Sequence, residues 1–338
     1  MSRRPLTAVA AALLAVSLGV IGATLPVPFV ALGPGPTHDT LGDYEGTQIV
    51  RVEGLPQYPT TGHLNMTTVS VTDRLSLFTT LWFWASGERR VIPRESVFPS
   101  DRTDQEIQDE NAAQFASSES NAEAAAVTEL GLPARVLVAG VVADSPAAGV
   151  LEAGDEIVSV AGQPVASAAE VSDRLTDARP GDTVAIDYRR EGTEQQVDVV
   201  LGASPDRAQG FLGVRPTVEA RDGAIDISLD GIGGPSAGLM FSLAVVDRLT
   251  PGELTGGRFI AGTGSIDPSG AVGAIDGVPF KMAKASEVGA EVFLVPDANC
   301  AEAVSTAPDG LDLIRVTTLD DAIDQLDALR AGRPTAPC

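Results

Sequence analysis

The chain opens with its longest uncharged run. No charged side chain occurs from residue 5 to residue 37, and Leu6–Leu25 alone supplies 20 apolar or small residues. That length is enough to cross a bilayer as a helix, and the two arginines before it place the N-terminus in the cytoplasm. We therefore expect a transmembrane anchor, with everything after it outside the cytoplasm. A cleaved signal peptide is the alternative, with Ile21-Gly22-Ala23 as the nearest cleavage site, and it exports the same residues.

The periodic pattern of hydrophobic and polar residues is weak between residues 39 and 130. Gln48–Val52 and Thr67–Val71 have the character of strands. Leu75–Trp84 gathers both tryptophans of the chain with two phenylalanines, and it is too short to span a bilayer. We interpret it as an aromatic core segment, with a position on the membrane interface as the alternative. Asp101–Leu130 is acidic and alanine-rich, and we interpret it as an exposed helix and linker.

Two further patterned regions follow, and together they predict an α+β, multidomain protein. The first predicts a small β-rich unit, with strands at Val136–Val142, Ile157–Val160, Thr183–Tyr188 and Gln196–Leu201 and a helix at Ala168–Thr176. The second predicts strands at Ala224–Leu229, Glu291–Val295 and Leu311–Val316, alternating with helices at Leu239–Leu249, Lys281–Val288 and Leu319–Leu329.

Composition narrows the possible chemistry. A net charge of −23 without a basic patch argues against nucleic-acid binding. Neither Lys281 nor Lys284 is followed by Ser or Thr, so the chain has no P-loop and we expect no ATP. The two histidines, His38 and His63, form no ligand pattern, and we expect no bound metal and no cofactor.

Lysine is scarce, which draws attention to Lys281. Only two of the 23 basic residues are lysines. Arginine stays protonated in proteins, whereas a desolvated lysine loses its charge and can act as a base. The alternative is that Lys281 and Lys284, three residues apart, simply solvate one helix face.

A glycine-rich turn provides a possible partner for that base. Gly234-Pro235-Ser236-Ala237-Gly238 lies between an expected strand and a buried helix, with Pro235 expected at the first helical position. Its G-x-S-x-G pattern suggests a nucleophile elbow, but no histidine follows the serine. A lysine base beside a serine is a known arrangement, and the helix N-terminus could stabilise an oxyanion. The alternative is a turn with a capping serine.

Residues 205–330 resemble the proteolytic domain of the Lon family. The resemblance is carried by Pro235-Ser236-Ala237-Gly238, by Ala261-Gly262-Thr263-Gly264-Ser265-Ile266 and by the glycine-rich approach at 270–277 to Lys281. It implies Ser236 as nucleophile, Lys281 as base and Thr263 as a supporting hydrogen-bond partner, with Gly234, Pro235 and Ala237 in the oxyanion region. Many members carry an acidic residue where Gly233 stands. We expect the ATPase module of full Lon to be absent.

Residues 132–202 resemble a PDZ domain, through the run at 145–151 and the segment 153–165. Such a domain binds an extended peptide at a sheet edge beside a helix. We expect the groove between the first strand and the Ala168–Thr176 helix, lined by Val136, Leu137, Val138, Val171 and Leu175. The usual Gly-Leu-Gly-Phe carboxylate loop is missing from the approach to that strand, where Leu132-Pro133-Ala134-Arg135 stands. The alternative is a domain that only braces the rest of the chain.

This order of parts is similar to that of bacterial membrane-anchored PDZ–Lon proteases. It divides the chain into an anchor (1–32), an extracytoplasmic region with an acidic helix (33–130), a PDZ domain (131–203) and a Lon-type domain (204–338). The resemblance implies an ATP-independent serine endopeptidase acting on exported or membrane-tethered proteins, and a hexamer ring is possible by resemblance alone. A non-catalytic scaffold and a protease that processes only itself are the alternatives.

The chain has two cysteines, Cys300 and Cys338. An even count outside the cytoplasm permits a disulfide bond. We expect Cys300 to pair with Cys338 and so hold the C-terminal tail, with two unrelated thiols as the alternative.

Overall fold

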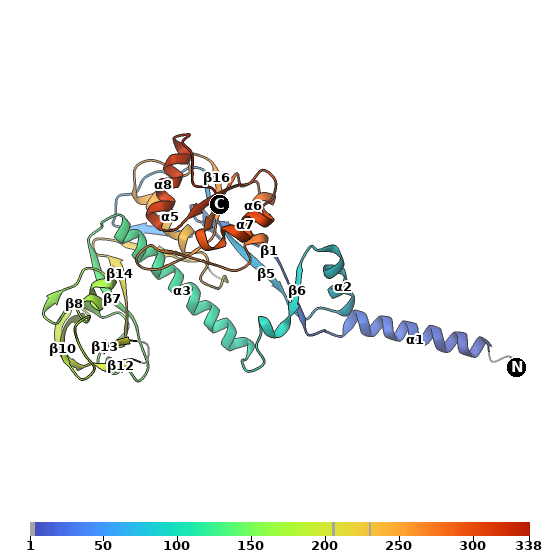
Figure 1. The fold of residues 1–338 in the computed structure, drawn as a ribbon, viewed down its shortest axis with the longest axis horizontal. Helices are drawn as coiled ribbons and strands as arrows, with labels where there is room; N and C mark the ends of the chain where they lie inside the picture. The colour runs from blue at the N-terminus through green and yellow to red at the C-terminus, as the bar shows by residue number, and fades with distance from the viewer. Residues whose placement is uncertain (1–3, 205–206, 230) are drawn as a thin grey trace.

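The computed structural model describes residues 4–204, 207–229 and 231–338. Helix α1 (Arg4–Thr24) projects away from the other elements, and the N-terminus lies at its far end (Figure 1). Its stretch Thr7–Thr24 has a mean hydropathy of 2.0 and is almost wholly exposed. The helix has the length and apolarity expected of a membrane anchor or a signal sequence.

The larger of two sheets is mixed. Its strand order is β20-β19-β16-β5-β1-β6, formed by β20 (Asp312–Val316), β19 (Val292–Pro296), β16 (Phe259–Gly262), β5 (His63–Thr72), β1 (Phe29–Asp39) and β6 (Arg90–Pro93). Neighbours from β20 to β5 run parallel, whereas β1 is antiparallel to both β5 and β6. Strand β19 is a run of five buried residues, as a central strand covered on both faces requires.

Helices cover both faces of this sheet (Figure 1). One face packs on α5 (Gly238–Leu249), α3 (Asp104–Glu129) and α8 (Leu319–Arg330). The other packs on α6 (Val278–Glu287) and α7 (Cys300–Thr306). Alternate residues of β19 belong to the two cores, because successive side chains of a strand point to opposite faces. Helix α5 is buried on all sides from Gly238 to Arg248.

Residues 33–130 fold together with residues 204–338. The sequence predicts two separate regions, and the structure differs from that prediction. Strands β1 and β5 lie between β6 and β16 in one sheet, and β4 (Val50–Glu53) pairs with β15 (Ala224–Ile227). Helix α3, expected to be exposed, has a capping box at Thr103 and packs on α5, where the rings of Phe115 and Phe241 lie 5.8 Å apart. Residues 33–130 and 204–338 therefore form one folded unit, held together by strand pairing and by shared buried contacts.

The smaller sheet is antiparallel and has its own core. Its order is β11-β10-β8-β7-β14, with β9 beside β8. The strands are β7 (Ala134–Val141), β8 (Glu156–Val160), β9 (Gln163–Pro164), β10 (Thr183–Arg190), β11 (Thr193–Val200) and β14 (Val214–Ala220), and α4 (Ala168–Asp173) lies nearby. The expected strands and helix are present, but β14 extends the sheet beyond the expected boundary at residue 203.

The aromatic segment forms a surface helix, α2 (Leu77–Ser86), capped by Ser76 and Gly87. None of its residues is buried. The interpretation of this segment as part of a core is therefore wrong, because both tryptophans are exposed on the surface.

Short elements complete the description. These are β2 (Asp43–Tyr44), β3 (Thr47–Gln48), β12 (Gly202–Ser204), β13 (Arg207–Phe211), β17 (Ser265–Ile266), β18 (Val272–Gly273) and the 3₁₀ turns η1 (Arg94–Ser96) and η2 (Asp297–Asn299). At the end of the chain, Cys300 and Cys338 form a disulfide bond. Arg315 N donates to Ala336 O at 2.9 Å beside it, so the tail is tied to β20.

Candidate active site

Ser236 lies in the turn that leads into α5. Gly234 has φ +92°, a left-handed conformation that suits glycine. The helix begins at Gly238, so Pro235 stands before the helix and not at its first position as expected. The carbonyl oxygen of Ser236 accepts from Gly264 N at 3.0 Å and from Thr263 Oγ1 at 3.1 Å. These two bonds fix the serine backbone against the segment that follows β16.

Lys281 lies in the first turn of α6, after Gly277 at the N-cap. Its side chain is only 3% exposed. Burial lowers the pKa of the Lys281 amine to about 8, and the Asp276 carboxylate acts weakly in the opposite direction. With this pKa, about half of the Lys281 amines are neutral near pH 8.

Thr263 connects the two residues. Its buried hydroxyl accepts a hydrogen bond from Lys281 Nζ at 3.0 Å and donates to the Ser236 carbonyl oxygen. Within the described part of the chain, no hydrogen bond joins the Ser236 hydroxyl directly to Lys281. The structure thus brings Ser236, Thr263 and Lys281 together, with Thr263 in the middle.

Ser236 and Lys281 line a cleft of about 680 Å³, and Thr263 is linked to it by the hydrogen bond from Lys281. Its walls include the loop 233–237, the segment 274–277 and the side chain of Phe115. Strands β1 and β5 contribute the rest through Leu32, Pro36, Met66, Thr68, Val69, Ser70 and Val71. Seven of the 20 residues that line the cleft therefore come from the region 33–130, which was expected to be separate.

Two of the expected oxyanion residues cannot serve as donors here. Pro235 has no N–H, and Gly234 N already donates to Asn111 O of α3 at 3.0 Å. The N–H groups of Ser236 and Ala237 donate to no other group among the described residues. They stand just before α5, where backbone donors and the helix dipole favour negative charge.

Helix α3 braces this turn, a role that sequence reasoning missed. Ser118 Oγ donates to Pro235 O at 3.2 Å, and Asn121 Nδ2 donates to Ile266 O at 3.0 Å. On the same helix, Ser120 forms a hydrogen bond with Thr217 of β14 at 2.9 Å. One helix therefore contacts both the Ser236 turn and the smaller sheet. The capping box at Thr103 indicates the start of α3, but not what it contacts.

The structure does not place a peptide groove beside β7, where the sequence predicts one. Strand β7, which holds Val136, Leu137 and Val138, is paired with β8 on one side and with β14 on the other. Neither edge of β7 is open to a peptide. The edge strand is β14, because the chain returns to the smaller sheet after residue 207.

A cavity of about 630 Å³ lies between β14 and α4. Val171 and Leu175, two of the expected groove residues, line it together with Gly210-Phe211-Leu212-Gly213-Val214. Gly213 has φ +89° and lies too close to Ser145 to carry a side chain. The run Gly-Phe-Leu-Gly before β14 is the signal that could have located this groove from the sequence, since it resembles the carboxylate loop that was sought before β7.

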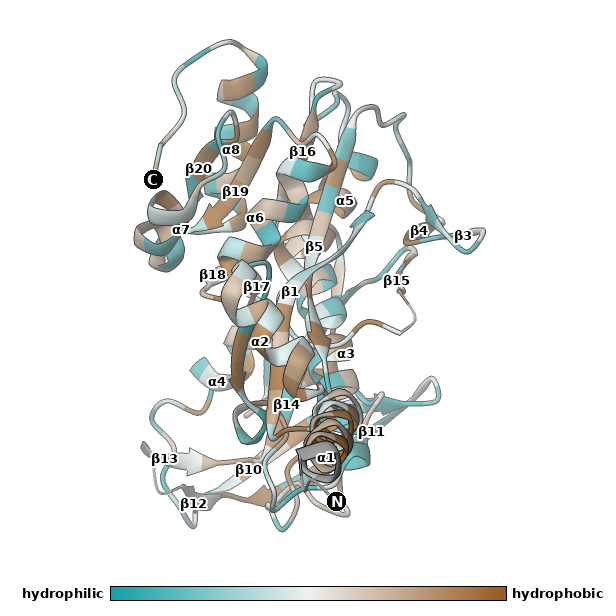
Figure 2. Cartoon of the chain, turned by 90° about the vertical axis from the view of Figure 1, so that its right-hand side faces the viewer, coloured by the Kyte–Doolittle hydropathy of each residue, from teal (hydrophilic) through white to brown (hydrophobic). Residues whose placement is uncertain are grey.

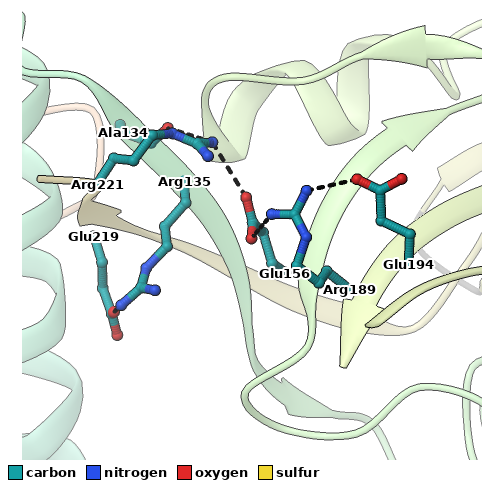
Figure 3. A network of polar contacts seen from close by, with 7 residues as sticks. All are labelled: Ala134, Arg135, Glu156, Arg189, Glu194, Glu219 and Arg221. Carbon is teal, nitrogen blue, oxygen red and sulfur yellow. Dashed lines mark hydrogen bonds and ion pairs between the residues drawn. The ribbon is translucent and has the colours of Figure 1, made fainter. Parts of the chain in front are cut away.

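A polar network fixes β14 to the sheet (Figure 3). Arg135 of β7 pairs with Glu219 of β14, and Arg221 donates to Ala134 O and to Glu156 of β8. Glu156 also pairs with Arg189 of β10. These contacts hold the strand that borders the cavity, and no other strand of the described chain pairs with its outer edge in this sheet.

Comparison with known proteins identifies the smaller unit. Residues 107–201 match the family model described as a PDZ domain. The chain contains a PDZ domain. The matched range starts within α3 and ends before Ser236, so it covers none of the three residues at the cleft.

Several relatives share this region. A probable periplasmic serine endoprotease, DegP-like, of Pseudomonas savastanoi pv. phaseolicola is 38% identical over 81 residues, which is 24% of this chain and 17% of that protein. A protein with the same description from Pseudomonas fulva is 31% identical over 100 residues, 29% of this chain and 21% of that protein. The chain therefore spans about a fifth or less of these relatives.

Two solved structures are similar to part of the chain. The PDZ domain of the SdrC-like protein Lmo2051 of Listeria monocytogenes is 36% identical, with 23% of this chain and 83% of that chain covered and a TM-score of 0.22. The corresponding domain of Lin2157 of Listeria innocua is 34% identical, with 24% of this chain and 90% of that chain covered and a TM-score of 0.23.

In the part of the chain that the structure describes, no group of three His, Cys, Asp or Glu side chains is placed to hold a metal ion.

Proposed function

We propose that this chain is a membrane-anchored, extracytoplasmic, ATP-independent serine endopeptidase with a Ser236–Lys281 dyad. The observation that carries the proposal is the buried Lys281 amine, which has a pKa of about 8 and is linked through Thr263 to the Ser236 turn beside an open cleft. A perturbed amine next to a nucleophilic residue in a cleft is characteristic of an active site. The Lon-type motifs around these residues support the same assignment.

The reaction follows from this arrangement. The neutral amine of Lys281 takes the proton of the Ser236 hydroxyl as Ser236 Oγ attacks a peptide carbonyl carbon. The N–H groups of Ser236 and Ala237 stabilise the oxyanion. Collapse of the tetrahedral intermediate breaks the C–N bond, and Lys281 returns its proton to the leaving amine. Water then attacks the acyl-enzyme with Lys281 again as base and releases the acid product.

Thr263 positions the amine in this scheme. Its hydroxyl is held by the Ser236 carbonyl oxygen and accepts from Lys281 Nζ. The amine must turn from Thr263 toward the serine hydroxyl to act as base. Because the amine is buried, few water molecules compete for it.

The PDZ domain supplies substrate recognition in this proposal. An extended peptide adds to the free edge of β14 and fills the cavity beside α4 with its side chains. PDZ-bearing relatives described as periplasmic serine endoproteases support both the protease role and a place outside the cytoplasm. The apolar helix α1 supports export, with the catalytic part on the outer side.

Cleavage of unfolded casein by the purified full chain tests the proposal. We expect the parent chain to cleave casein, and Ser236→Ala or Lys281→Ala to lower the rate by about 10³-fold or more. Ser265→Ala is the matched control, because Ser265 lies on β17 outside the lining of the cleft. Unchanged cleavage by Ser236→Ala would refute the dyad.

Two other functions share the same residues or the same fold. A protease that acts only on itself would show a Ser236-dependent change in its own mass and leave casein intact. A scaffold would show neither, and its PDZ groove would still bind peptides. The buried Lys281 amine, which forms no ion pair with any described residue, favours a catalytic role over a scaffold, because burying a charge-bearing group costs stability.

A further inference from the structure

Helix α2 exposes a large apolar surface that no part of the described chain covers. Trp82 is 62% exposed and Trp84 is 77% exposed. Leu77, Phe78 and Leu81 are also exposed, and with Trp82 they recur at the spacing of one helix face. Surface apolar patches of this kind mark a contact with a protein or a membrane.

The position of α2 favours a lipid surface as the contact. The chain that leaves α1 turns directly to the start of α2, since Val27 N donates to Leu75 O at 2.8 Å and Pro26 bridges to Ser76. Phe78 lies against Gly22, in the last turns of α1. Helix α2 is therefore level with the outer end of the apolar stretch Thr7–Thr24. Figure 1 shows α2 beside the end of α1 that leads into the folded unit, and Figure 2 shows apolar segments on both helices.

The residue types of α2 fit this level of a bilayer. Tryptophan is enriched where a membrane meets water. Exposed arginines, Arg74 and Arg90, flank the helix, and Arg89 lies over the ring of Phe83. Guanidinium groups beside an apolar helix suit the phosphates of lipid headgroups.

We propose that α2 is an interfacial helix that rests on the outer lipid surface and fixes the orientation of the folded unit on its anchor. The proposal rests on insertion of α1, but it does not require proteolytic activity. The cleft runs along β5 from Met66 to Val71, about 17 Å at the rise of a strand, and Leu77 follows six residues later. The end of the cleft at Val71 then faces the membrane surface. This position favours substrates with an extended segment close to the bilayer.

The tryptophans make a direct test possible, because the chain has only Trp82 and Trp84. The Ser236→Ala full chain, which removes self-cleavage, is reconstituted in vesicles of phosphatidylcholine and phosphatidylglycerol. The vesicles are washed with alkaline carbonate so that only inserted chains remain. Tryptophan emission is then recorded with ordinary and with dibrominated phosphatidylcholine. We expect brominated lipid to reduce the emission by roughly half, since such helices lie at the boundary of headgroups and acyl chains.

A relocated tryptophan is the matched control. The triple variant Trp82→Tyr, Trp84→Tyr, Tyr58→Trp places the reporter on the exposed loop between β4 and β5. Its emission should be insensitive to brominated lipid and quenched by aqueous acrylamide. Parent emission that bromine leaves unchanged would overturn the proposal. A blue-shifted, bromine-insensitive emission that grows with the protein-to-lipid ratio would also overturn it, since it would indicate contact with a second copy of the chain.

Discussion

The two lysines of the chain lie three residues apart on α6 but have different surroundings. Lys284 is partly exposed and pairs with Glu287, whereas Lys281 is buried and its amine donates to the Thr263 hydroxyl. Desolvation without a hydrogen-bonded carboxylate favours the neutral amine. The sequence indicated Lys281 through the rarity of lysine and the distance to Ser236. It did not indicate how the amine is buried, because that depends on contacts with β1 and β5 more than 200 residues earlier.

The pKa of Lys281 predicts a pH profile. The amine acts as a base only when neutral, so kcat/KM should rise with pH and level off above an apparent pKa near 8. Lys284→Arg is the matched control and should keep the same profile. The measurement is the initial rate of peptide cleavage between pH 6 and 10. A profile that is flat from pH 6 upward would mean that another group is the base.

The hydroxyl of Thr263 can be removed without changing the size of the side chain. In Thr263→Val, Lys281 Nζ and the Ser236 carbonyl each lose a buried partner. We expect kcat to fall by roughly 10- to 100-fold, given about 1.5–3 kcal/mol for a bond to a charged or buried group. Thr263→Ser retains the hydroxyl and should recover most of the rate. Equal rates for the Val and Ser variants would contradict the positioning role.

At the scale of elements, α3 shows what a residue pattern conceals. Its buried face consists mainly of alanines, namely Ala122, Ala124, Ala125 and Ala126, and small residues produce little amphipathic contrast. The acidic residues suggested an exposed linker, yet the alanines allow α3 to pack closely on α5. Similarly, β7 was recognised as a strand, but its partners were not, because pairing with β14 depends on a connection of over 70 residues.

The bond from Ser118 to the Ser236 turn gives an element-scale prediction. Ser118→Ala removes the donor to Pro235 O and should lower kcat about fivefold, the equivalent of about 1 kcal/mol. Ser117→Ala is the control, since Ser117 is exposed on the same helix and should have no effect. Steady-state kinetics at 25 °C separate the two. A normal kcat for Ser118→Ala would show that α3 does not position the turn.

At the scale of the whole molecule, one folded unit is assembled from distant parts of the chain. The PDZ domain stands between its two contributions, and α3 contacts both the PDZ edge strand β14 and the Ser236 turn. Local patterns predicted four of the six strands of the smaller sheet, β7, β8, β10 and β11, but only three of the six strands of the larger sheet, β5, β19 and β20. They did not predict that β1 and β5 complete the larger sheet, because strand pairing over about 200 residues leaves no local signal.

The C-terminal disulfide contributes to the stability of this unit. Cys300 and Cys338 enclose a separation of 38 residues, for which chain entropy gives at most about 4 kcal/mol. The double variant Cys300→Ser, Cys338→Ser should unfold at a temperature several degrees lower and keep its activity at 25 °C. Thermal unfolding with and without reductant measures the effect. Reductant should lower the midpoint of the parent alone, and equal midpoints for parent and variant would contradict the prediction.

The most direct test of the account is the capture of the acyl-enzyme. The full chain is mixed with a chromogenic peptide ester, quenched in acid within the first turnover and mapped by mass spectrometry. We predict a burst of leaving group and an acyl adduct on the peptide that contains Ser236, with neither burst nor adduct in Ser236→Ala. An adduct on a different residue, or ester turnover that persists in Ser236→Ala, would contradict the assignment of Ser236 as the nucleophile.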